Sequence, residues 1–397
     1  MNRKFRVIFI FITKVSKRDY QRFGCDIIQK RGYEVEVWDC SQWLNKEYSM
    51  CYNVQDPFDF PGLKLFNTFE STKSAFSEIT QKDIIIDPFH ILLNHNFGKI
   101  NGGKVIRFFC GEEPTPFKVF YKISTYDLYL KSLYADIKNN PLKIFTKIKK
   151  HIFIKKTLPY NVTILGGTDG EKHIVNCVNN DSTTILRAHA FDYDRYLEEE
   201  MKDESKGNIP QVPYAVFLDQ NFLDHPDQHI NGLSSNLLVR RPELFLTEIN
   251  NFFKNFSSQS GLDIVIAAHP RSNYNNQNNL YDGNIPIRGE TISLVKGAKV
   301  VMAHKSISLN FAVLYHKPVI LLDSDYITQF LKNYLDLFET ELGLHRINIT
   351  HTQSISVKDI IIDKVKYRQF KKQFIKEPGT PEKFTGDIIC DYLDRMN

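Results

Sequence analysis

The sequence predicts an α/β protein made of two consecutive domains, each built on a parallel β-sheet. Its 397 residues are enough for two domains at roughly 100–200 residues per domain. Apolar runs of strand length alternate with segments of helical periodicity along most of the chain, which is typical of parallel sheets covered by helices. A polar, charged segment at 198–211 divides this alternation into two series.

The first series occupies residues 1–197 and begins with a β–α–β unit. Residues 5–12 form a continuous apolar run, as expected for a strand buried on both faces of a sheet. Tyr20, Phe23 and Ile27 then recur at helical spacing, and Gly32 ends the helix. We predict further strands at 35–38, 84–86, 105–109 and 162–165.

The α/β alternation restarts after a linker that we place at 198–212, so the second domain spans 213–397. Its predicted strands are 214–218, 263–268, 300–302 and 318–322. Its predicted helices lie at 242–256, 291–296 and 308–315, with two more near the C-terminus around 367–374 and 386–396. Two such units predict two Rossmann-like domains that face each other across a cleft.

Composition narrows the class of protein. No run approaches the ~20 apolar residues that a membrane-spanning helix needs, and the N-terminal apolar run lacks the cleavage site of a signal peptide. We therefore expect a cytoplasmic protein. The six cysteines are scattered without a C-x-x-C pair, which argues against a zinc site or a disulfide framework.

A basic stretch at 131–156 carries much of the net charge of +5. Lysines alternate there with apolar residues, so the stretch could rest on the inner face of an anionic membrane. A helix with an apolar core face and a solvated lysine face explains the same pattern. No nucleic-acid-binding motif accompanies the charge, and we expect no nucleic-acid partner.

Two turns of the second domain are candidates for ligand binding. His269, Pro270 and Arg271 follow a buried strand, and ligands of open α/β folds bind beyond the carboxyl ends of strands. Ser306 and Ser308 follow the next strand and open a helix, where free backbone amides and serine hydroxyls suit a phosphate. Loop fixing by the histidine and simple helix capping by the serines are the alternatives. The same sites include Lys305, Thr291, Asp219 and Gln220.

The pairing of His269-Pro270 with the Ser306 turn resembles motifs of bacterial sialyltransferases and Kdo transferases of surface-polysaccharide biosynthesis. The resemblance implies the GT-B architecture, a CMP-activated sugar donor, and binding of its phosphate by His269 and Ser306 or Ser308. The pairing also resembles the CDP-glycerol glycerophosphotransferases of teichoic-acid synthesis, whose serine turn usually reads Asp-Tyr-Ser-Ser. Here the turn is His304-Lys305-Ser306-Ile307.

Sialyltransferases of this architecture carry an acidic-acidic-Gly motif in the first domain, where a carboxylate deprotonates the acceptor. The segment nearest to it here is 166–170, in which Thr168 replaces the first acid and Asp169 is the candidate base. Glu112 and Glu113, after the strand at 105–109, are further candidates. A glycine-flanked turn is the alternative reading of Asp169.

The other acidic motifs give weaker evidence of a functional site. Asp192-Tyr193-Asp194 and Asp323-Ser324-Asp325 match D-x-D by letters only, so we expect no metal. Arg187, His189, Asp192 and Asp194 precede the linker, where anchoring the hinge is favoured over lining the cleft. Walker and dinucleotide-binding glycine motifs are absent from the sequence, and we expect no cofactor.

Together these patterns predict a glycosyltransferase that moves a 3-deoxy-ulosonic acid, either Kdo or a sialic-like nonulosonate, from its CMP derivative to a hydroxyl of a surface glycan. The acceptor could be lipid-linked. Two alternatives stay open: a CDP-alcohol phosphotransferase of teichoic-acid type, and a non-catalytic nucleotide-sugar binding protein.

Overall fold

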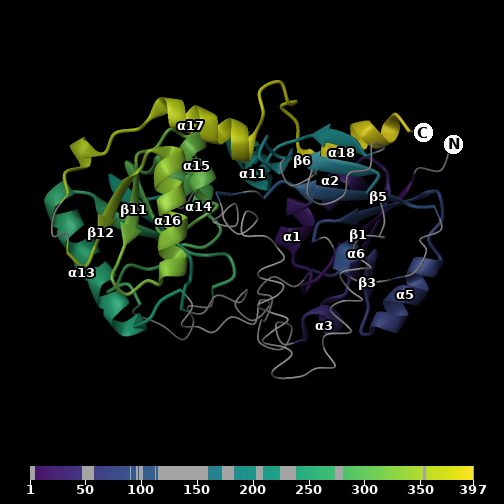
Figure 1. The fold of residues 1–397 in the computed structure, drawn as a ribbon, viewed down its shortest axis with the longest axis horizontal. Helices are drawn as coiled ribbons and strands as arrows, with labels where there is room; N and C mark the ends of the chain where they lie inside the picture. Colours follow the sequence, from purple (N-terminus) through teal and green to yellow (C-terminus); the bar gives the residue numbers. More distant parts are fainter. Residues whose placement is uncertain are drawn as a thin grey trace, which may run out of the picture.

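A computed structural model describes residues 5–46, 58–89, 91–94, 97, 102–111, 113–114, 160–171, 183–202, 209–223, 238–272, 280–351 and 355–396. Two parallel sheets lie side by side along the long axis of the molecule, each with helices around it (Figure 1). We call the part built on the first sheet the first unit and the part built on the second sheet the second unit. The basic stretch at 131–156 and Glu112 lie outside the described residues.

The sheet of the first unit has the strand order β3-β2-β1-β4-β5-β6-β7, and every neighbouring pair is parallel. Strand β1 is central. Its alternate residues Val7, Phe9 and Phe11 join the core on one face, while Ile8 and Ile10 join the core on the other. The continuous apolar run therefore reflects burial on both faces. The strands are β1 Arg6–Phe11, β2 Glu34–Asp39, β3 Leu63–Leu65, β4 Asp83–Asp87, β5 Lys104–Phe109, β6 Val162–Leu165 and β7 Thr184–Arg187.

The sheet of the second unit has the order β12-β11-β10-β8-β9 and is also parallel throughout. Its order reverses between β8 and β10, as the order of the first sheet does between β1 and β4. In open α/β sheets, ligands bind at such reversal points, outside the carboxyl ends of the strands. The strands are β8 Tyr214–Leu218, β9 Asp263–Ala267, β10 Val300–Ala303, β11 Val319–Asp323 and β12 His345–Asn348.

Helices cover the sheets in both units (Figure 1). The first unit contains α1 Lys17–Arg22, α2 Cys25–Lys30, α3 Ser41–Leu44, α5 Phe69–Ser77 and α6 Ile91–Asn94. The second unit contains α13 Pro242–Ser260, α14 Thr291–Gly297, α15 Leu309–Leu314, α16 Gln329–Leu342, a 3-10 turn η3 Val357–Asp359, α17 Lys364–Phe370 and a π-helical turn η4 Lys371–Ile375. Helix α11 Phe191–Glu200 lies where the chain passes between the units, and α18 Thr385–Asp394 lies near the C-terminus.

The C-terminal helix differs from the expected division at 213, because α18 packs on the first unit rather than the second. Ile389 and Leu393 of α18 are fully buried in the same core as Phe9. Arg31, the residue that follows α2, forms ion pairs with Asp387, Asp391 and Asp394 of α18, at N–O distances of 3.1, 3.1 and 2.8 Å. The chain therefore crosses from the first unit to the second and then returns (Figure 1).

The segment expected to begin a linker at 198 is still helical, since α11 continues to Glu200. Helix α11 contributes Phe191 to the core of the first unit and Tyr193 to the core of the second. The returning chain runs beside it: the Ala190 N–H donates to the Ile375 carbonyl at 2.7 Å, and His189 Nε2 lies 2.7 Å from the Lys383 carbonyl oxygen. The two crossings thus form one double connection between the units.

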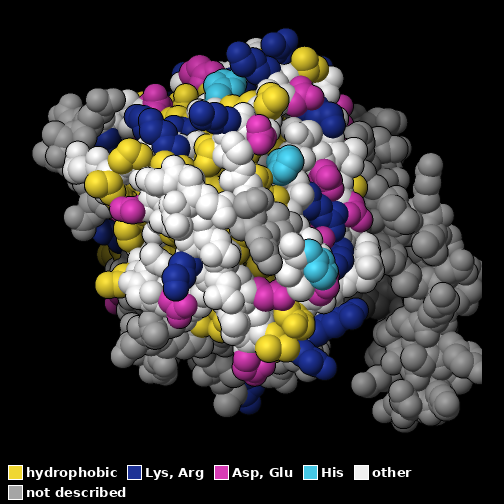
Figure 2. Space-filling view, turned by 90° about the vertical axis from the view of Figure 1, so that its left-hand side faces the viewer, with side chains coloured by type: hydrophobic (Ala, Val, Ile, Leu, Met, Phe, Trp, Pro, Cys, Tyr) yellow, Lys and Arg dark blue, Asp and Glu magenta, His cyan; other side chains and the backbone are white. Residues whose placement is uncertain are grey.

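The outer surface of the second unit is chemically mixed (Figure 2). Figure 2 shows the end of the second unit that faces away from the first, where hydrophobic side chains are scattered among charged and polar ones. No helix within the described residues is both long and apolar enough to cross a membrane.

Candidate functional site

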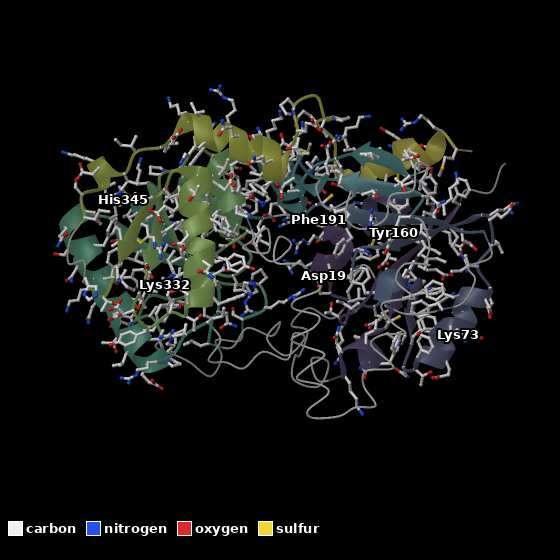
Figure 3. The ribbon with its side chains drawn as sticks, in the orientation of Figure 1. Asp19, Lys73, Tyr160, Phe191, Lys332 and His345 are labelled. Carbon is white, nitrogen blue, oxygen red and sulfur yellow. The ribbon has the colours of Figure 1, made fainter. Side chains whose placement is uncertain are left out.

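A cavity of about 370 Å³ lies between the two units. Its walls come from the loop after β1 and helix α1 on one side, and from the turns after β9 and β10 and the start of α14 on the other. Helix α11 closes it at the double connection. In Figure 3, Asp19 and Phe191, which both line this cavity, lie at the boundary between the units. The cavity therefore sits at the carboxyl ends of strands of both sheets.

Cationic side chains outnumber acidic ones in the cavity wall. The cations are Lys14, Arg18, Arg22, Arg195, Arg271 and Arg288, and the acids are Asp19, Asp192, Asp194 and Glu198. Both units contribute cations, so the wall suits an anion that contacts both units.

The local structure of α1 places two of these arginines together. Ser16 caps the helix, its side chain accepting from the Asp19 N–H at 3.1 Å. Arg18 and Arg22 follow four residues apart, on one helix face, where like charges repel. Burial between the two units, together with the positive charges of Arg22 and Arg271, lowers the pKa of Arg18 to about 10. Its side chain lines the cavity and is 42% exposed.

The His269-Pro270-Arg271 turn presents its second and third residues to the cavity. His269 holds the turn together: its Nδ1 accepts from the Arg271 N–H at 3.2 Å, and its carbonyl accepts from the Ser272 hydroxyl at 2.6 Å. Arg288 donates to the Ser272 carbonyl at 2.5 Å, which ties the segment before α14 to the same turn. The turn thus carries Arg271 to the cavity and fixes Arg288 beside it.

The serine turn after β10 is divided between two roles. Ser308 lines the cavity, as does Thr291 at the start of α14. Ser306 is 2% exposed, and its hydroxyl accepts from the Ser308 N–H at 3.2 Å. In this state Ser306 fixes the turn, and Ser308 and Thr291 supply the hydroxyl groups at the cavity wall.

Two of the predicted catalytic carboxylates, Asp169 and Glu113, are described by the structure, and neither lines this cavity. Asp169 is 1% exposed, in a loop whose backbone packs on η4, where the Asp169 N–H donates to the Gln373 carbonyl at 3.0 Å. Glu113 forms an ion pair with Lys305 at 2.7 Å, and the Lys305 ammonium lies over the Tyr334 ring at 4.4 Å. Glu113 follows β5 and Lys305 follows β10, so this pair joins the two units.

Asp219 and Gln220 line a much smaller cavity, of about 20 Å³, beyond the carboxyl end of β8. The Asp219 carboxylate accepts from the Asn221 N–H at 2.8 Å. Burial raises the pKa of Asp219 to about 6, although contacts with Asn221 and Tyr281 lower it. His304 lines the same small cavity, and burial lowers its pKa to about 4. This site has room for about one water molecule.

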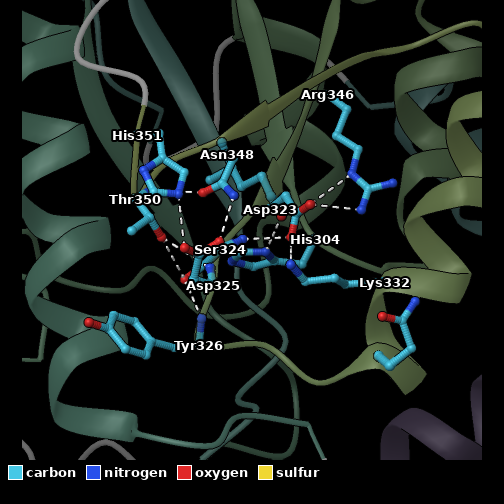
Figure 4. Close-up of polar contacts among 12 residues, drawn as sticks. His304, Asp323, Ser324, Asp325, Tyr326, Lys332, Arg346, Asn348, Thr350 and His351 are labelled. Carbon is cyan, nitrogen blue, oxygen red and sulfur yellow. Dashed lines mark hydrogen bonds and ion pairs between the residues drawn. The ribbon is translucent and has the colours of Figure 1, made fainter.

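The second D-x-D match, Asp323-Ser324-Asp325, is engaged by protein groups (Figure 4). Asp323 accepts from Arg346 at 2.7 and 3.0 Å. Ser324 donates to Glu248 at 2.8 Å, and Asp325 accepts from Asn348 at 2.9 Å. These contacts brace the carboxyl ends of β11 and β12. Within the described residues, no three His, Cys, Asp or Glu side chains are grouped so as to hold a metal ion.

A second large cavity, of about 450 Å³, adjoins the first through Lys14, which lines both. It lies at the carboxyl ends of β1 and β2 in the first unit. Apolar Val15, Phe58 and Leu63 line it together with the polar side chains of Asp39, Ser41, Gln42, Asp59 and Asn67.

Sequence patterns identified Pro270, Arg271, Ser308 and Thr291 at the main cavity but missed the arginines of α1. Arg18 and Arg22 had one usable signal, a like-charged pair at i, i+4 directly after the first strand. Such a pair is unfavourable in an isolated helix. The sequence favours a hinge role for Asp192 and Asp194, whereas the structure places both in the cavity wall.

Comparison with protein-family models and with curated proteins finds no match. Among solved structures, the chain is similar to Arabidopsis thaliana UGT89C1 complexed with UDP, at 9% identity and a TM-score of 0.52, covering 99% of this chain and 100% of that one. It is similar to the calicheamicin glycosyltransferase CalG4 at 10% identity and a TM-score of 0.50, covering 99% of each chain. It also resembles the wall teichoic acid polymerase TagF at 10% identity and a TM-score of 0.51, covering 100% of this chain and 89% of that one. The chain therefore has the GT-B fold, with two Rossmann-like domains.

Proposed function

We propose that this protein is a glycosyltransferase that moves a sugar from a nucleotide-activated donor to a hydroxyl group, with the donor phosphate bound between the two units. The cavity between the units carries this proposal. Arg18 and Arg22 of the first unit face a wall that contains Arg271 and Arg288 of the second. A bound phosphate would relieve the repulsion among these cations and would form charge-assisted hydrogen bonds with them.

The proposed donor is a CMP-linked 3-deoxy-ulosonic acid, either Kdo or a sialic-like nonulosonate. Such a donor carries a sugar carboxylate in addition to its phosphate, so it presents two anionic groups to a cavity with cations on both sides. The resemblance to CMP-sugar transferases implies that His269 and Ser306 bind the phosphate, although in this state they fix the turns that carry Arg271 and Ser308 to the cavity wall. Ser308 and Thr291 would add hydroxyl contacts from the cavity wall.

The proposed acceptor is a hydroxyl group of a surface glycan, which the adjoining cavity of the first unit would receive. Its apolar side chains suit the faces of a sugar ring, and its carboxylates suit sugar hydroxyls. A lipid-linked acceptor and contact with the inner face of a membrane stay predictions, because the basic stretch that motivates them lies outside the described residues.

A CDP-alcohol phosphotransferase of teichoic-acid type is the second candidate. The likeness in fold to the wall teichoic acid polymerase TagF favours retaining it. That reaction would use the same cationic cavity for the phosphates of a CDP-alcohol. The two candidates share the cytidine nucleotide and differ in the group transferred.

A thermal-shift panel with CMP, CDP, UMP, UDP and GDP tests the proposal on wild type, His269→Ala and Arg368→Ala. At a nucleotide concentration of 100 times Kd, binding stabilises the folded protein by about 2.7 kcal/mol. We expect the largest shift with CMP, a smaller shift in His269→Ala, and an unchanged shift in Arg368→Ala, whose exposed side chain lies on α17. A larger response to UDP or GDP, or no response at all, would refute the cytidine donor.

A further inference from the structure

A carboxylate that the resemblance did not identify lies in the wall of the main cavity, next to the turn proposed to bind the donor. Asp192, the second residue of α11, accepts a hydrogen bond from the Asn310 amide at 3.1 Å. Asn310 lies two residues after Ser308, which lines the same cavity. The carboxylate is thus held beside the proposed phosphate site.

Helix α11 fixes this position by packing on the second unit. Ser293 of α14 donates to Glu199 at 2.5 Å, and Tyr315, just after α15, donates to Glu200 at 3.0 Å. Asn310 makes a further side-chain contact, near the N-terminal end of α11. Thr291 begins α14 and Ser308 directly precedes α15, so Asp192 is held by the same elements that border the proposed donor site.

The other acids of the cavity wall have structural contacts that occupy their carboxylates. Asp19 accepts from the Ser16 hydroxyl at 2.9 Å and pairs with Arg18. Asp194 accepts from the Thr385 N–H at 2.9 Å and lies 3.5 Å from His189 Nε2. Glu198 pairs with Arg195. Asp192 differs from them, because within the described part of the chain its carboxylate accepts a hydrogen bond from a neutral amide of the second unit and forms no ion pair within 4 Å.

The surroundings of Asp192 both raise and lower the pKa of its carboxyl group. Burial raises its pKa, while the charges of Arg22, Arg18 and Arg195 and the hydrogen bond from Asn310 lower it. The net effect is a raised pKa, which makes the carboxylate a stronger base than an exposed aspartate. Asp194 and Glu198 share α11 with it, and Arg271 and Arg288 face the same cavity from the second unit.

We propose that Asp192 is the catalytic base that deprotonates the acceptor hydroxyl, an inference that rests on the proposed function. The acceptor proton passes to a carboxylate oxygen of Asp192 while the acceptor oxygen forms a bond to the anomeric carbon of the donor. The bond from that carbon to the phosphate oxygen breaks, and CMP leaves with the electron pair. The proton then passes from Asp192 to water.

The candidates from the resemblance are placed less favourably for this step. Asp169 is 1% exposed and packs behind η4, so no acceptor reaches it in this state. Glu113 must first break its ion pair with Lys305. Asp192 already borders the cavity, and it requires no such rearrangement.

The test measures CMP release with water as the acceptor, from CMP-N-acetylneuraminate, CMP-Kdo and CDP-glycerol, by wild type, Asp192→Asn and Asp263→Asn. Asp263→Asn is the matched control, since this exposed aspartate begins β9 at the end of the strand opposite the cavity. We expect Asp192→Asn to lower kcat by about 100-fold or more. It should bind CMP at least as tightly as wild type, because a negative charge leaves a cationic cavity.

A second variant separates a catalytic role from a structural one. Asn310→Ala removes the hydrogen bond that lowers the pKa of Asp192, so the acid limb of the pH dependence of kcat should move to higher pH. A merely structural carboxylate would leave that limb in place. The inference is overturned if Asp192→Asn keeps the wild-type kcat while CMP still binds, or if wild type binds CMP but releases it from none of the three donors. Failure of wild type to bind any nucleotide overturns the proposed function itself.

Discussion

At the scale of single residues, the arginines of the cavity should determine how tightly an anion binds. Arg271→Ala removes a cation that the turn after β9 carries to the cavity wall. A hydrogen bond to a charged group contributes about 1.5–3 kcal/mol, so we expect CMP to bind about tenfold more weakly or worse. Arg271→Lys should recover part of the loss, because it keeps the charge without the planar guanidinium.

Isothermal titration calorimetry with CMP measures this effect, and Arg368→Ala is the control that removes an exposed arginine from α17. Equal affinities of wild type and Arg271→Ala for CMP would mean that the phosphate lies elsewhere.

Asp219 should make stability depend on pH, in a direction that its burial determines. Its folded-state pKa of about 6 lies above the unfolded value of 3.8. Between these values the folded protein retains a proton that the unfolded chain releases. Stability therefore falls as pH rises from about 4 to about 6, by roughly 3 kcal/mol in total.

The asparagine of Asp219→Asn has no proton to titrate, so this variant should not share the loss of stability of wild type. The Tm of Asp219→Asn minus the Tm of wild type should therefore rise by about 5–10 °C between pH 4 and pH 7. Differential scanning calorimetry of both proteins at three pH values measures the difference. A Tm difference that stays constant with pH would contradict the buried, protonated carboxyl.

At the scale of helices and strands, the contact between α2 and α18 depends on two glycines. A Cβ on Gly386 would lie 2.9 Å from the Ile27 Cβ and 3.1 Å from the Gly24 carbonyl oxygen. Gly24 has a φ of +76°, which also favours glycine. Gly386→Ala should therefore push α18 away from the first unit and lower stability by about 1–3 kcal/mol.

Gly111→Ala is the matched control, because an added Cβ there meets no atom within 4 Å. Chemical denaturation followed by circular dichroism compares the two variants with wild type. If both glycine variants lost the same stability, helix crowding could not be the cause.

The helices and strands also show which parts of the fold can be predicted from the sequence. Buried parallel strands such as 162–165 and 214–218 have the predicted bounds, since burial on both faces leaves a continuous apolar run. Strand β12, with the residues His345–Asn348, has no such run, because it lies at the edge of its sheet. The sequence predicts helix α18, but it does not predict that this helix packs on the first unit. Its apolar spacing predicts a helix, whereas which of two cores it joins depends on contacts with residues more than 350 positions away, such as Arg31.

The residues of the candidate site also fall into those that a local sequence pattern predicts and those that it does not. Strand ends followed by Pro270-Arg271 and Ser308 are local signals, and the structure brings both turns to the cavity. Arg22 and Asp192 come together with them only because the two units meet, which no local pattern reports. Asp169 illustrates the reverse case: it follows a strand as a cleft residue should, but the returning chain at η4 covers it.

At the scale of the whole molecule, a ligand that contacts both units should stabilise both. The chain has two tryptophans, Trp38 and Trp43, and both belong to the first unit. Tryptophan fluorescence therefore follows unfolding of the first unit alone, while circular dichroism follows both. If CMP binds between Arg18 and Arg271, it should raise the midpoint of the fluorescence transition, although the predicted nucleotide turns belong to the second unit.

Arg18→Ala tests this coupling, because it removes the contact of the first unit without altering the turns after β9 and β10. We expect the CMP-induced shift of the fluorescence midpoint to shrink in Arg18→Ala, while the shift seen by circular dichroism is retained in part. Arg368→Ala should behave as wild type by both probes. A wild-type protein in which CMP shifts the circular dichroism transition and leaves the tryptophan transition unmoved would show that the nucleotide binds the second unit only. In that case the repulsion among Arg18, Arg22 and Arg271 would have to be relieved by a different anion, with the acceptor as the natural source.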